Sequence, residues 1–69
     1  MPLIMADTGK PLLIKKIGGK EDCRKFLESL GLVPGATISI ISKISGNIII
    51  QVKESRIAVN KELASKIIV

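Results

Sequence analysis

The 69-residue chain can form one small domain with a single core, and it is too short for a two-lobed enzyme with a cleft between domains. Ile and Val make up 17 of the 69 residues, which favours strands over helices. The chain has no His, Trp or Tyr and only one Cys. It therefore lacks an imidazole base, an internal disulfide and a CxxC site. The net charge of +5 permits an acidic protein, a nucleic acid or an anionic membrane as partner and selects none of them.

The apolar runs are only a few residues long, far below the roughly 20 residues that span a bilayer. The N-terminus has neither the basic start nor the apolar stretch of a signal peptide. A lone Cys fits a reducing compartment. We therefore expect a cytoplasmic chain with no direct insertion into a membrane.

The first third of the chain predicts one helical turn and one strand. Residues 3–5 are apolar and can close the open end of a sheet with a single turn of helix. Residues 11–17 read as a strand with mixed apolar and charged side chains on both faces. The pattern alone therefore leaves open which face of this strand meets the core.

The clearest element is a helix over residues 21–30. Its apolar residues recur at helical spacing and form one stripe, which we expect to lie in the core: Cys23, Phe26, Leu27 and Leu30. Gly31 follows directly and can end the helix in the left-handed conformation. Pro34 and Gly35 then occupy the two central positions of a type II turn.

After this turn the hydrophobic period changes from 3.6 to 2, which indicates strands. The alternation slips at Ile41, where a bulge or bend is expected. A hairpin connection is predicted at 45–47, further strands at 48–53, 56–59 and 67–69, and Asn60 is a candidate N-cap for a helical turn over 61–65. The prediction is an all-β chain, a small, partly open barrel of about five strands with one inserted helix.

Two segments resemble one protein family. Residues 27–35, LESLGLVPG, are similar to the LxxLGLxPG signature of the ferrous iron transport protein A family, FeoA. Residues 56–59, RIAV, followed by Glu62, Ala64 and Ile67, resemble the family's closing strand, short helix and last strand. Residues 36–40 match the family's strand after that turn, and the spacing of residues 3–9 and 14–17 fits its N-terminal part. The ordered set therefore covers nearly the whole chain.

The resemblance implies a single FeoA-like domain over 1–69, with an SH3-like barrel and a helix inserted after the first strand. It also implies a cytosolic accessory of the ferrous-iron transporter FeoB, whose cytosolic region contains a GTPase domain. The same fold family includes a domain of iron-dependent repressors, so a metalloregulator-like interaction domain is an alternative.

The chain itself is not expected to be an enzyme. Gly18-Gly19-Lys20 suggests a phosphate-binding loop, but that motif needs a Gly where Ile14 stands and a Ser or Thr where Glu21 stands. The carboxylates are scattered along the sequence, and no two-His-one-carboxylate set can form. We therefore predict no catalytic, cofactor-binding or metal-binding residues.

The candidate partner-binding residues fall into three sets. A basic set could dock on an acidic protein surface, although a merely solvated face explains it as well: Lys15, Lys16, Arg24 and Lys25. Leu32 and Val33 are expected at the tip of the turn whose geometry is set by Gly31, Pro34 and Gly35. Ile41 and Ile49 are expected to point outward from paired strands, which leaves a partner surface or a homo-oligomer open.

A small nucleic-acid-binding barrel is a further alternative, because lysines could contact a phosphate backbone. Such proteins normally add aromatic side chains on which bases stack. With Phe26, the only aromatic residue, assigned to the core, no such platform is left, so nucleic acid is not the favoured partner.

Overall fold

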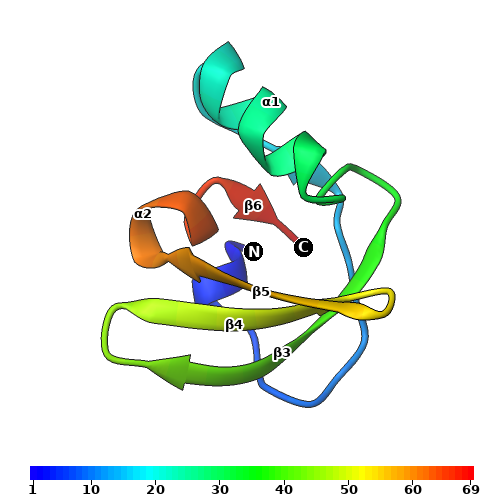
Figure 1. Cartoon of the computed structure of the whole chain (residues 1–69), viewed down its shortest axis with the longest axis vertical. Helices are drawn as coiled ribbons and strands as arrows, with labels where there is room; N and C mark the ends of the chain where they lie inside the picture. The colour runs from blue at the N-terminus through cyan, green and yellow to red at the C-terminus, as the bar shows by residue number, and fades with distance from the viewer.

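The computed structural model describes residues 1–69 and shows six strands in two sheets, two α-helices and one 3-10 turn. In chain order the elements are η1 (Leu3–Met5), β1 (Leu12–Leu13), β2 (Lys16–Ile17), α1 (Glu21–Ser29), β3 (Thr37–Ile44), β4 (Asn47–Val52), β5 (Ser55–Asn60), α2 (Lys61–Ala64) and β6 (Ile67–Ile68). Figure 1 shows α1 on one side of the molecule and the sheet of β3, β4 and β5 on the other, with β6 between them.

The larger sheet is antiparallel, with strand order β1-β3-β4-β5. Alternate aliphatic side chains of β3 and β4 point into the core and are at most 4% exposed: Ile38, Ile40, Ile48, Ile50 and Val52. The alternation follows from the two-residue period of a strand with one buried face. The predicted period-2 segments are therefore confirmed.

The phase slip at Ile41 is a β-bulge. The register between β3 and β4 shifts between Ile40 and Ser42, so Ile41 is the extra residue. The hairpin that joins the two strands turns at Gly46, whose φ is +84°. Both the bulge and the hairpin lie where the sequence predicts them.

The expectation of one strand over residues 11–17 is wrong, and this raises the number of strands from about five to six. β1 pairs with β3, whereas β2 pairs with β6 in a separate two-stranded sheet. Ile14 lies between them and is 1% exposed. The chain changes sheets at this point, which explains why neither face of the segment is consistently apolar.

The N-terminal turn η1 closes the core, as expected. Leu3 is fully buried, and the Lys43 ammonium donates hydrogen bonds to the carbonyls of Ile4 and Ala6 at 3.0 and 2.7 Å. The terminal amine donates to the Val69 carbonyl at 3.0 Å. Both termini therefore lie side by side, between α1 and the larger sheet (Figure 1).

Helix α1 ends in a Schellman motif. The N–H of Gly31 donates to the Glu28 carbonyl at 2.9 Å, and the N–H of Leu32 donates to the Leu27 carbonyl at 3.0 Å. Gly31 has a φ of +89°, a left-handed conformation that is unfavourable for residues with a Cβ atom. The motif brings together two side chains that are both fully buried, Leu27 and Leu32.

The short helix α2 begins at the predicted N-cap. The Asn60 side chain accepts a hydrogen bond from the Leu63 N–H at 2.8 Å. Ala64 is fully buried at the other end of the helix. None of the helices combines the length and the apolar character that crossing a lipid bilayer requires.

Candidate partner-binding groove

A groove lies where three segments of the chain meet. Residues 15–17, which include β2, form one side, Arg24 and Glu28 of α1 form another, and the loop 32–34 completes it. Gly31 and Gly35 shape this loop, because both have positive φ values, +89° and +92°. The Ala36 N–H donates to the Val33 carbonyl at 3.0 Å, which closes the turn with Pro34 and Gly35 at its centre.

The groove combines positive charge with an apolar wall. Lys15, Lys16 and Arg24 are exposed, and Glu28 is the only acidic side chain among the lining residues. Ile17 and Val33 are half-buried. A ligand in the groove can therefore meet cations and aliphatic carbon at the same time.

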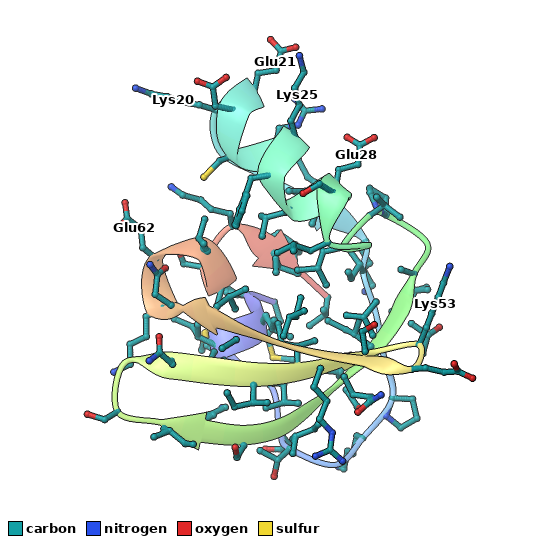
Figure 2. The ribbon with its side chains drawn as sticks, in the orientation of Figure 1. Lys20, Glu21, Lys25, Glu28, Lys53 and Glu62 are labelled. Atoms are coloured by element: carbon teal, nitrogen blue, oxygen red, sulfur yellow. The ribbon has the colours of Figure 1, made fainter.

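Three of the four basic residues in the predicted set line this groove, and Lys25 does not. Lys25 pairs with Glu21 at 3.4 Å on the exposed surface of α1, with both side chains more than 70% exposed. This pair is an i,i+4 contact and stabilises the helix by only about 0.3–0.5 kcal/mol. Figure 2 shows Glu21 and Lys25 near each other at the end of α1 that is farthest from the larger sheet.

The expectation that Leu32 is exposed at the tip of the turn is wrong. Leu32 is fully buried, because the Schellman motif folds it back against Leu27. It forms the floor beneath the groove, whereas Val33 is half-buried and accessible from it. The pattern of an aliphatic residue directly after Gly31 could have predicted this burial.

The outer face of the larger sheet is a separate surface. Ile41 is 39% exposed and Ile49 is half-buried. The structure adds two exposed residues that the sequence pattern did not single out, Ile44 at 58% and Leu13 at 53%. The structure does not bring these aliphatic side chains together with the groove residues.

The placement of Phe26 and Cys23 in the core is also wrong. Phe26 is 51% exposed, and Cys23 is half-buried. Only Leu27 in the middle of the stripe is fully buried, because α1 meets the rest of the molecule along one narrow line. The objection that no aromatic side chain is available at the surface is therefore removed.

No three His, Cys, Asp or Glu side chains come together in a group that could hold a metal ion. No polar side-chain atom is buried without a hydrogen-bond partner. Gly18 and Gly19 form the turn before α1, where the Gly18 N–H donates to the Lys66 carbonyl at 2.7 Å.

Comparison with known proteins identifies relatives over the full length of the chain. The family model described as the FeoA domain matches residues 1–69. A protein of Methanocaldococcus jannaschii, provisionally named Fe(2+) transport protein A, is 35% identical over 68 residues, which are 99% of this chain and 83% of the relative.

Solved structures show the same fold. The crystal structure of an iron uptake regulatory protein (FeoA) has a TM-score of 0.87 and 38% identity, with 97% of this chain and 91% of that chain covered. The solution structure of iron(II) transport protein A from Clostridium thermocellum has a TM-score of 0.89 and 25% identity, with 99% of this chain and 43% of that chain covered. A manganese-dependent transcriptional repressor, at 13% identity and a TM-score of 0.88 over 97% of this chain and 39% of that one, shares the fold alone.

The signature residues 27–35 form the end of α1 and the turn that follows, as the resemblance implied. The neighbouring structures confirm the SH3-like fold class. Because the family model matches all 69 residues and a relative exceeds 30% identity, the chain belongs to the FeoA family of ferrous iron transport proteins.

Proposed function

We propose that this protein is a cytosolic accessory of ferrous iron uptake that acts by binding the cytosolic region of a FeoB-type transporter. The single observation that carries the proposal is the match to the FeoA domain over residues 1–69. The groove between residues 15–17 and α1 supplies an accessible surface with charge for such an interaction.

Differential binding is the physical requirement for regulation. A bound module changes the conformational equilibrium of a transporter only if it binds one state more tightly than another. In a binding experiment, the nucleotide bound to the GTPase domain is the variable that is easiest to control. The chain then needs no reactive group of its own, because the chemistry stays with the partner.

The test is retention of the purified protein on an immobilised FeoB cytosolic region, without nucleotide, with GDP and with a non-hydrolysable GTP analogue. We expect saturable binding whose affinity differs between nucleotide states. The resin without FeoB, and FeoB with a heat-unfolded sample, are the controls. Equal background retention on all resins would contradict the proposal.

Nucleic-acid binding is the second candidate, and the exposed Phe26 is the observation that favours it. Its position argues in the opposite direction. Arg24 and Phe26 are two residues apart and point about 200° apart around the helix, so the aromatic ring faces away from the groove. Oligonucleotide binding that weakens steeply with salt would support this alternative.

A further inference from the structure

We propose that the groove receives an acidic peptide segment in which Asp or Glu side chains flank an aliphatic residue. The assignment of that segment to FeoB rests on the proposed function, whereas the chemistry of the ligand follows from the groove itself. The groove is defined by its lining residues: Lys15, Lys16, Ile17, Arg24, Glu28, Leu32, Val33 and Pro34.

The charge of the groove is not neutralised within the chain. Both ion pairs of the protein lie elsewhere, between Lys10 and Asp7 and between Lys25 and Glu21. No side-chain hydrogen bond involves the three basic groups of the groove. Three cations beside one carboxylate give the groove a local charge of +2, which favours carboxylates in a ligand.

Arg24 gives this preference a geometry. A guanidinium can donate two parallel hydrogen bonds to one carboxylate, and an ammonium acts as a point charge. Arg24 lines the groove from α1, whereas Lys15 and Lys16 line it from the segment that contains β2. Carboxylates at both ends of a short segment can therefore be met at once.

The apolar wall between these charges favours an aliphatic residue in the ligand. The half-buried Ile17 and Val33 present carbon to the groove, and the fully buried Leu32 lies beneath them. A ligand made only of anionic groups would leave this wall in contact with water. Covering it with one Leu, Ile or Val side chain adds apolar burial to the charge pairing.

Other anionic partners fit less well. A concave site set between a helix and a strand cannot lie flush on a flat membrane surface. A nucleic acid would need a longer basic track. The acidic side chains of α1 interrupt any such track along the helix: Glu21, Asp22 and Glu28.

The probe for the test is a short fluorescein-labelled peptide in which Glu residues flank a central Leu, and the readout is fluorescence anisotropy at low salt. Arg24→Glu and Lys16→Glu should each weaken binding about tenfold. The matched control is Lys53→Glu, which changes the net charge equally at the turn between β4 and β5 and does not line the groove (Figure 2). It should stay within about twofold of the wild type.

Two further variants separate a direct role from loss of fold. Glu28→Gln removes the one repulsive group and should tighten peptide binding about threefold, whereas Glu62→Gln on α2 should change nothing. Val33→Thr keeps the side-chain shape and should weaken binding of the Leu peptide but not of its Gly counterpart. Circular dichroism of each variant checks that it is folded.

Equal losses for Arg24→Glu and Lys53→Glu would overturn the proposal, because binding would then follow net charge alone. Tighter binding of an oligonucleotide or of anionic vesicles than of the peptide would also overturn it. The two proposals fail separately. Peptide binding without FeoB retention contradicts the proposed partner, and FeoB retention that is insensitive to Arg24→Glu contradicts the groove.

Discussion

The larger sheet and the helix α1 use their aliphatic side chains differently. Along β3 and β4 the five inward-facing aliphatic residues are almost completely removed from water, whereas only Leu27 of the nine residues of α1 is fully buried. The sheet buries one whole face, and the helix is attached along a line. The sheet therefore stabilises the fold, and the open flanks of the helix are available for a partner.

The strongest test of this difference between the sheet and α1 is to remove one buried aliphatic side chain from each region. Ile50→Ala and Leu27→Ala should each lower the free energy of unfolding by about 2–5 kcal/mol, because both residues are fully buried. Hydrogen exchange should distinguish them. Leu27→Ala should lose amide protection mainly over residues 21–29, and Ile50→Ala should lose it throughout the sheet.

Uniform loss of protection in Leu27→Ala would contradict the comparison, because it would make helix and sheet one cooperative unit. The conservative variant Ile50→Val should cost about 0.5–1.5 kcal/mol. It serves as the measurable replacement if the alanine variant of β4 unfolds completely.

The end of α1 is the next largest test. Gly31→Ala should destabilise the protein by about 1–2 kcal/mol through the positive φ alone. An added Cβ would also lie 3.3 Å from Cγ1 of Val52, so the helix end is fitted closely to β4. Gly35→Ala is the control that isolates the cost of the positive φ, because no atom lies within 4 Å of the position that its Cβ would occupy.

Urea denaturation of both glycine variants measures the two contributions. We expect Gly31→Ala to be the less stable variant. Equal stabilities would show that Val52 yields at no cost. An unchanged midpoint for both would contradict the left-handed conformations themselves.

The cap of α2 should have a smaller effect. Asn60→Ala removes the acceptor of the Leu63 N–H and should cost about 1 kcal/mol. Asn47 is also exposed, lies opposite Asn60 in the pairing of β4 with β5, and makes no side-chain hydrogen bond. Asn47→Ala is therefore the matched control. Thermal melts of both variants test this prediction. An equal decrease in melting temperature for the two variants would contradict the stabilising role of the Asn60 cap.

The smallest expected effect is at Phe26. A Phe buried in a core costs about 3–5 kcal/mol when it is replaced by Ala. Because this ring is 51% exposed, Phe26→Ala should cost less than about 1 kcal/mol in a urea titration. A loss of several kcal/mol would show that α1 packs its whole stripe, as the sequence pattern predicted.

Patterns of neighbouring residues predicted the positions of helices, strands and turns better than they predicted which faces of these elements are buried. The cap at Asn60, the bulge at Ile41 and the turn at Gly31 each depend on a few neighbouring residues, and all three lie where expected. The switch between sheets at Ile14 depends on distant strands, β3 and β6, which no local pattern contains.

The candidate site shows the same division. Lys15, Lys16 and Arg24 could be named from the sequence as a basic set, but their convergence depends on how the strand turns into α1. Amphipathic spacing gives a stripe about 100° wide. It cannot tell how much of that stripe the rest of the fold covers, and this is why Phe26 was misplaced.

The most direct test of the central claim is the affinity of the purified protein for the cytosolic region of FeoB, measured by titration calorimetry for wild type, Arg24→Glu and Lys53→Glu. We predict saturable binding for the wild type and Lys53→Glu, and at least about tenfold weaker binding for Arg24→Glu. Absence of binding by the folded wild type, or the same affinity for all three proteins, would contradict a docking role for this groove.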